Sequence, residues 1–221
     1  MIYVFGDSHA LKFVWHCPTR WIAGLTCHGF CGGDISVMVE EIFNLAGVDG
    51  LIPRREVGWN IFANEFLPLV GKEDAILFVL GEPDCRIQFY YHYVRDGIPL
   101  QTLVNATVKR YMDFLNALDY RVGVLDVIPA INQDNVYEFD HYADRSTRAG
   151  IAVMFNGALR LACLANHIPF LSLWDMVADE NGFLIDEYAT ADYTHIRADV
   201  PELMAVLDYQ LEEAFGCGLG M

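Results

Sequence analysis

Ser8, Asp192 and His195 are the residues of this chain whose types and spacing could do chemistry. Ser8 lies in VFGDSHALKF, residues 4–13, directly after an apolar run, and the other two share the tetrapeptide DYTH near the opposite end. A serine hydroxyl becomes a nucleophile when a histidine takes its proton, and a carboxylate can fix the tautomer of that histidine. The three residues could form a Ser-His-Asp triad. Taken singly, Ser8 could equally be a turn residue or helix cap, Asp192 a cap and His195 a surface residue.

The segments that must position these residues alternate between strands and helices. Short runs rich in branched or aromatic residues predict buried parallel strands, and apolar residues at three- and four-residue intervals predict helices. The predicted strands are 2–5, 75–80, 121–128 and 168–174, and the predicted helices are 34–47, 105–118, 148–167 and 200–215. This order predicts an α/β fold with a mostly parallel sheet and helices on both faces.

Polar residues follow each predicted strand where it ends. They lie in GDS at 6–8, GEPDCR at 81–86, PAINQD at 129–134 and at Asp175. Ligands of open α/β sheets bind beyond the carboxyl ends of the strands. We therefore expect the functional surface along this rim, with DYTH in a loop before the last helix.

Composition limits the possible partners. The 221 residues include 14 basic and 30 acidic side chains, for a net charge of −16, which disfavours nucleic acid and anionic membranes. No apolar run approaches the roughly 18–20 residues that span a bilayer. The length favours one domain over residues 1–221. The opening MIYVFGDS is expected to be core strand rather than a leader, which predicts a cytoplasmic protein with its six cysteines reduced.

The two ends of the chain resemble the SGNH hydrolases, also called GDSL-type esterases. In that family the nucleophile lies in a GDS block after the first strand, and the acid and base lie near the C-terminus as D-x-x-H. Gly6-Asp7-Ser8 and Asp192-Tyr193-Thr194-His195 match both blocks. The resemblance implies a three-layer α/β/α sandwich with a flavodoxin-like sheet, Ser8 as nucleophile, His195 as base and Asp192 as its orienting acid.

The resemblance also implies an oxyanion hole. One donor would be the N–H of Ser8, and a second the N–H of a glycine, for which Gly33 is the first choice and Gly24 or Gly29 are alternatives. The family's G-x-N-D block supplies an asparagine, but here GEPD has Pro83 at that place. LGEPDCR, and the downstream segment 155–182, resemble a variant with G-E-x-D-C-R.

In that variant Arg86 is the natural substitute for the missing asparagine, with Gln88 as a second candidate. Arg86 could instead form a salt bridge to Glu82 or Asp84 that braces the loop. Tyr90 and Tyr91, which follow the same block, are candidate substrate-binding residues beside Gln88, although an aromatic cluster of this kind can also be packing.

A metal site is not expected. Cys27, His28 and Cys31 in CHGFC are the nearest approach to one, but their spacing differs from the usual C-x2-C.

Together these features predict a serine esterase that hydrolyses small acyl esters without a cofactor. The substrate would be a small-molecule or carbohydrate ester, and the resemblance leans towards O-acetyl groups on carbohydrate. An O-acyltransferase using the same triad, and a catalytically weak binding or accessory protein, stay open as alternatives, as does the oligomeric state.

Overall fold

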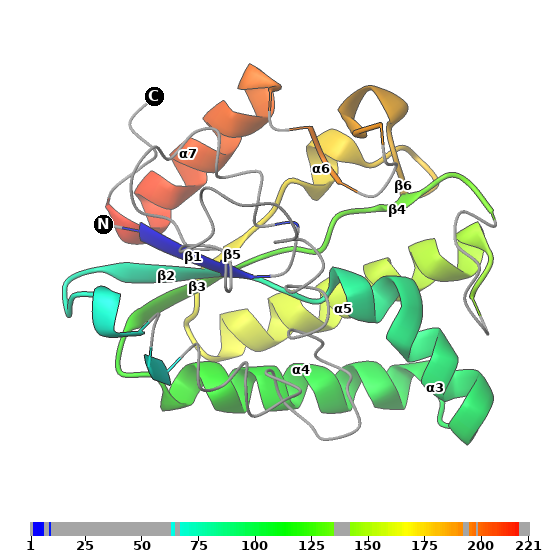
Figure 1. Cartoon of the computed structure of the whole chain (residues 1–221), viewed down its shortest axis with the longest axis horizontal. Coiled ribbons are helices and arrows are strands. Elements are labelled where there is room, and N and C mark those ends of the chain that lie inside the picture. The colour runs from blue at the N-terminus through cyan, green and yellow to red at the C-terminus, as the bar shows by residue number, and fades with distance from the viewer. Residues whose placement is uncertain are drawn as a thin grey trace.

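The computed structural model describes residues 2–6, 9, 63–64, 67–134, 142–191, 195–197 and 199–216. Within these ranges the main sheet has four strands, all parallel, in the order β1-β2-β3-β5 (Figure 1). The strands are β1 (Ile2–Gly6), β2 (Ala75–Val79), β3 (Arg121–Leu125) and β5 (Phe170–Leu171). A second, two-stranded parallel sheet joins β4 (Ala130–Ile131) to β6 (Phe183–Leu184).

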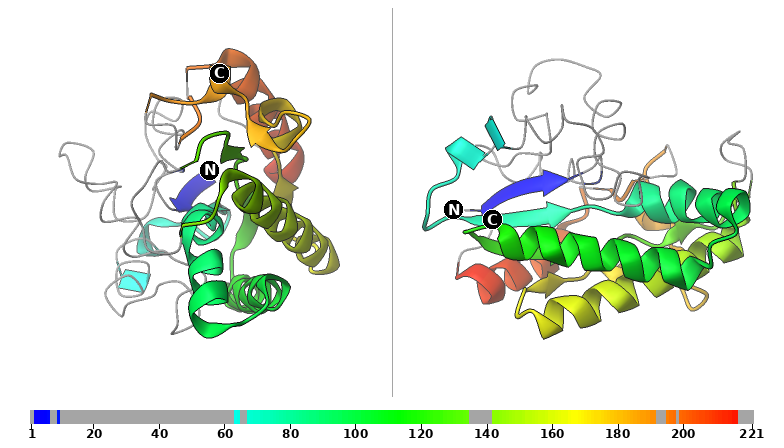
Figure 2. Two further views of the ribbon diagram at one scale, coloured as in Figure 1. Left: turned by 90° about the vertical axis from the view of Figure 1, so that its right-hand side faces the viewer. Right: turned by 90° about the horizontal axis from the view of Figure 1, so that it is seen from below.

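Helices cover both faces of the main sheet. They are α3 (Phe89–Asp96), α4 (Leu100–Ala117), α5 (Arg145–Ala165), α6 (Trp174–Val177) and α7 (Pro201–Phe215). Three short helical turns complete the order: η4 (Leu67–Leu69), η5 (Asp84–Gln88) and η6 (Asp186–Tyr188). The helices α4 and α5 lie side by side on one face, and α7 lies on the other (Figures 1 and 2). The predicted three-layer α/β/α architecture is confirmed.

Side-chain alternation along the strands creates a separate core on each face. Tyr3 and Phe5 of β1 belong to the core that α4 and α5 cover, whereas Val4 between them belongs to the core under α7. The same alternation separates Phe78 of β2 from its neighbour Leu77. Because consecutive strand residues point to opposite faces, a continuous apolar run is needed for a strand buried on both sides.

The helix α5 begins where its N-cap provides a hydrogen-bond acceptor. Asp144 accepts the N–H of Thr147 at 2.8 Å, which satisfies one donor of the first turn. Its buried residues Ile151, Phe155 and Leu159 recur at four-residue intervals and face the core. In the described ranges α5 is also the one helix with the length and apolar composition of a membrane span, a test that the core helix of a globular protein passes equally.

Two strands end earlier than the sequence predicts. The runs 121–128 and 168–174 were expected to be strand throughout, but β3 stops at Leu125 and β5 covers only Phe170–Leu171. The cause is Asp126, a buried carboxylate that accepts the hydroxyl of Ser172 at 2.5 Å and the N–H groups of Leu173 and Trp174 at 3.2 Å. These bonds turn the chain after Leu125 and after Leu171 away from the hydrogen-bond ladder between β3 and β5.

Helix boundaries differ by a few residues. The helix predicted over 105–118 begins at Leu100, after Pro99, and those predicted over 148–167 and 200–215 are α5 and α7. The helix predicted over 34–47 lies outside the described residues.

Amide side chains hold the chain beyond two of the strand ends. Asn156 of α5 accepts the N–H of Val127 at 2.9 Å and donates to its carbonyl at 2.7 Å. Gln210 of α7 accepts the N–H of Ser172 at 2.7 Å and donates to its carbonyl at 2.8 Å. Each amide supplies the two hydrogen bonds that a neighbouring strand would otherwise make, so the backbone stays paired after it leaves the sheet.

Gly81, where the chain leaves β2, provides a stability test. Its φ is +116°, and a Cβ there would approach the ring of Phe155 to 2.7 Å. We expect Gly81→Ala to lower the free energy of unfolding by about 1–3 kcal/mol, because it combines backbone strain with overpacking. Urea unfolding measures the change. Gly150→Ala is the control: this exposed position within α5 has open space around it, so alanine should stabilise the helix by about 0.5–1 kcal/mol. Equal effects of the two substitutions would contradict the argument.

Candidate active site

The carboxyl ends of the strands lie in one row across the sheet. Gly6 pairs with Val79, Val79 with Leu125, and Leu125 with Leu171, so the loops that follow these residues leave at one level. At Gly6 a Cβ would overlap the carbonyl of Val79, which explains the glycine at the start of the GDS block. The expected rim therefore exists, and the residues after β1 and β2 meet on it.

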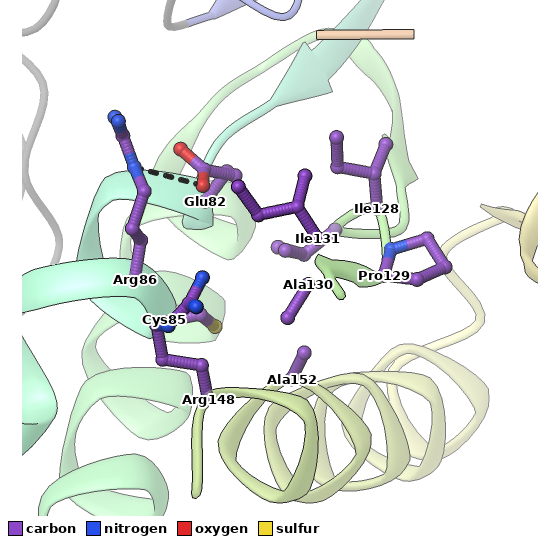
Figure 3. A pocket seen from close by; sticks show the side chains of 10 residues that line it. Glu82, Cys85, Arg86, Ile128, Pro129, Ala130, Ile131, Arg148 and Ala152 are labelled. Atoms are coloured by element: carbon purple, nitrogen blue, oxygen red, sulfur yellow. Dashed lines mark ion pairs between the residues drawn. The ribbon is translucent and has the colours of Figure 1, made fainter. Parts of the chain in front are cut away.

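Three buried side chains from this rim form a chain of ion pairs. Oε1 of Glu82 lies 3.0 Å from Nε of Arg86, and Oε2 lies 3.1 Å from Nε2 of His9. Glu82 and Arg86 are four residues apart in a helical turn and so face the same side, and Figure 3 shows this pair. His9 is 3% exposed and the other two 9%. The arrangement joins the end of β1 to the block after β2.

The charges around Glu82 keep it ionised. Burial alone would raise the pKa of this carboxyl, but the guanidinium of Arg86 and the imidazole of His9 outweigh burial, with a smaller contribution from His195. The pKa is therefore lowered from 4.5 to about 2. Glu82 is an anion, and a pure hydrogen-bond acceptor, at any pH at which the protein would work.

His195 lies against this cluster. Its ring centroid is 4.6 Å from that of His9, and the two ring planes are inclined by 34°. The carbonyl of His195 is held by the N–H of Thr190 at 2.9 Å and by its hydroxyl at 3.0 Å. The loop that carries the D-x-x-H histidine is therefore in contact with the residue that follows Ser8.

The other predicted site residues after β1 and in the D-x-x-H block are not described. Ser8, Asp192 and Gly33 lie outside the described residues, as do the alternatives Gly24 and Gly29. Their proposed roles stay predictions.

The block after β2 adopts a helical conformation that accounts for its proline. Pro83 is αR, with φ −58° and ψ −30°, in the turn that precedes η5. A proline is tolerated in a first helical turn because the N–H that it lacks has no helical partner there. Arg86 makes the ion pair to Glu82 that was one of its two predicted roles. Its role toward an oxyanion stays a prediction.

The residues predicted to bind substrate lie at the end of η5 and on α3. Gln88 is half-buried, and Tyr90 packs against the core with its ring 5.9 Å from that of Tyr93. The ring of Tyr91 lies 4.9 Å from the guanidinium of Arg95. In the described part of the chain these three predicted residues do not line the pocket beside Glu82. Their binding role is still a prediction.

A small pocket adjoins Glu82. Its volume is about 20 Å³, and its walls come from the block after β2, the chain around β4 and α5 (Figure 3). The lining residues are Glu82, Cys85, Arg86, Val127, Ile128, Pro129, Ala130, Ile131, Arg148 and Ala152. A cavity holds one water when about 10–15 Å³ is open to the centre of the water molecule. As it stands the pocket takes a water rather than a sugar ring.

Sequence reasoning missed one of the groups that gather here, His9, although it directly follows the candidate nucleophile. Glu82 is one of the two salt-bridge partners that the sequence predicts for Arg86, the other being Asp84. The i, i+4 spacing of Glu82 and Arg86 was the available signal for their pairing. No sequence pattern predicts the contact between His9 and Glu82, because it depends on how β1 aligns with β2 in the sheet.

Metal binding has no support in the part of the chain that the structure describes. Those residues contain no group of three or more His, Cys, Asp or Glu side chains that could hold an ion. The CHGFC segment with Cys27, His28 and Cys31 lies outside them.

Comparisons with known proteins identify the fold. No family model matches the chain, and no curated protein matches it significantly. Among solved structures, a GDSL-like lipase from Bacteroides thetaiotaomicron matches with a TM-score of 0.56 and 15% identity, over 97% of this chain and 87% of the other. A Streptococcus pneumoniae protein named after platelet activating factor matches with a TM-score of 0.54 and 15% identity, over 97% and 83%. The chain has the fold of the GDSL-like hydrolases, and the predicted resemblance is confirmed at that level.

The buried pair of Glu82 and Arg86 should matter far more than an exposed pair of the same spacing. Because the pKa of Glu82 falls from 4.5 to about 2 on folding, its ionised form stabilises the protein above pH 4.5, and that contribution is lost as the pH falls towards 2. We expect Glu82→Gln to lower stability at pH 7 by about 2–4 kcal/mol, since it leaves Arg86 buried without its partner. It should also flatten the loss of stability between pH 4.5 and 2.

Urea unfolding at several pH values measures both effects. Asp113→Asn is the matched control, because Asp113 and Lys109 form an exposed i, i+4 pair at 2.6 Å, and such pairs contribute below about 1 kcal/mol. A pH dependence that Glu82→Gln leaves intact would show that another group produces it.

Proposed function

We propose that this protein is a serine esterase that hydrolyses small acyl esters. The observation that carries the proposal is the contact between the rings of His195 and His9. His9 adjoins Ser8 in the sequence, so this contact joins the candidate base, from the other end of the chain, to the residue that follows the candidate nucleophile. The fold shared with a GDSL-like lipase supports the same reading.

In the proposed reaction Ser8 Oγ attacks the ester carbonyl carbon while His195 takes the hydroxyl proton. The tetrahedral intermediate collapses, its C–O bond to the alcohol breaks, and His195 returns the proton to the leaving alkoxide. Water then attacks the acyl-enzyme, with His195 again as base, and releases the carboxylic acid and free Ser8. Asp192 orients His195 and stabilises its protonated form throughout.

The developing oxyanion needs donors that are already in place. The N–H groups of Ser8 and Gly33 are two proposed donors, and the guanidinium of Arg86 is the third. The Nε of Arg86 is held by Glu82, which fixes the direction of the side chain before substrate binds. A preorganised donor of this kind typically contributes about 10²–10³ in rate.

The proposed substrate is a neutral ester of small size, with O-acetyl groups on carbohydrate as the favoured class. A net charge of −16 would repel anionic substrates at long range, and an uncharged acetylated sugar avoids this repulsion. Transfer of the acyl group to a sugar hydroxyl would use the same first half-reaction.

A fluorophosphonate probe tests the nucleophile directly. We expect the probe to label Ser8, as mapped by peptide mass spectrometry, with no label in Ser8→Ala and at least about a 10³-fold slower reaction in His195→Ala. Ser146→Ala and His167→Asn are matched controls, since both residues are exposed and lie at opposite ends of the α5 segment. His167 has φ +57°, which asparagine tolerates.

Each outcome supports one of three functions: esterase, acyltransferase, or binding or accessory protein. Label on Ser8 with release of acetate from p-nitrophenyl acetate supports the esterase, and acetylated acceptor formed from added sugar would move the assignment to acyl transfer. Folded wild-type protein that takes no label would favour a binding or accessory protein.

A further inference from the structure

We infer that His9 and Glu82 form a second positioning unit for His195, in which Glu82 holds His9 and His9 presents its ring to the ring of His195. Two contacts support this unit: the 3.1 Å ion pair between Glu82 Oε2 and His9 Nε2, and the 4.6 Å separation of the two imidazole centroids. The inference rests on the proposed role of His195 as the base.

The state of His9 follows from that of Glu82. An ionised carboxylate only accepts hydrogen bonds, so the favourable arrangement places a hydrogen on Nε2 of His9. Arg86 anchors the other carboxylate oxygen at 3.0 Å, so a Glu82 that turned away from His9 would also lose this buried ion pair. The 3.1 Å contact to this anchored carboxylate favours a hydrogen on Nε2 of His9 and restricts rotation of its ring.

The fixed ring then restricts His195. Two imidazole rings with centroids 4.6 Å apart and planes inclined by 34° are close enough to restrict one another. The buried ring of His9 therefore excludes orientations of the His195 ring that would overlap it. A base that is already oriented loses less conformational entropy on reaching the transition state, and this raises the rate.

¹⁵N NMR of the His9 ring tests the unit without requiring turnover. The ¹⁵N shifts of the ring report its tautomer, and we expect a hydrogen on Nε2 of wild-type His9 at pH 7, on the side of the Glu82 carboxylate. A His9 ring without hydrogen on Nε2 would overturn the inference.

Kinetics of His9→Gln separate this inference from the proposed function. Glutamine keeps a donor for Glu82 but has no ring, so we expect kcat to fall about 10–100-fold with KM nearly unchanged. If His195→Ala abolishes labelling and His9→Gln keeps full kcat, the esterase stands and the positioning unit fails. If wild-type protein takes no label, the esterase fails, and the ¹⁵N shifts of His9 still decide whether Glu82 holds its ring.

Discussion

The ionised carboxylate of Glu82 is the charge on which the carboxyl edge of the sheet depends. It is buried, and among the described residues the guanidinium of Arg86 and the imidazole of His9, on its two oxygens, stabilise it most, with a smaller contribution from His195. Each partner comes from a different part of the rim, the turn after β2 and the residue that follows the GDS block. One anion thus couples the position of the candidate nucleophile segment to the block that would stabilise its oxyanion.

The remaining strand ends are held by side-chain hydrogen bonds. Asn156 and Gln210 pair with the backbone of Val127 and Ser172, and the carboxylate of Asp126 accepts three donors from the segment after β5. Loops at the edge of a sheet leave the ladder, yet their buried backbone groups still need partners. Side chains of α5 and α7, and Asp126 after β3, provide these partners where the sheet no longer does.

Sequence predicted the layers well because they depend on local patterns. Apolar runs placed β1 and β2, and helical spacing placed α4, α5 and α7, with errors confined to their ends. The predicted ends of β3 and β5 are wrong. The side chain of Asp126 hydrogen-bonds to Ser172, which lies far away in the sequence, and no local pattern predicts such a contact. Of the candidate site, the sequence predicted a salt bridge from Arg86 to Glu82 or Asp84, of which the pair with Glu82 is confirmed, whereas the role of His195 stays a prediction. The contacts of His9 needed the register of β1 on β2, which no local pattern encodes.

Pro83 and Arg86 together suggest why the block after β2 can do without an asparagine. A proline at the start of a helical turn sets the direction of the turn, and the turn places Glu82 and Arg86 on one side, four residues apart. An asparagine amide would offer a neutral donor to an oxyanion, whereas a guanidinium offers a full charge, which needs a counterion to be tolerated when it is buried. Glu82 is that counterion. The same carboxylate that would permit Arg86 to take the place of the amide also faces His9, so this replacement would bring a negative charge towards His195.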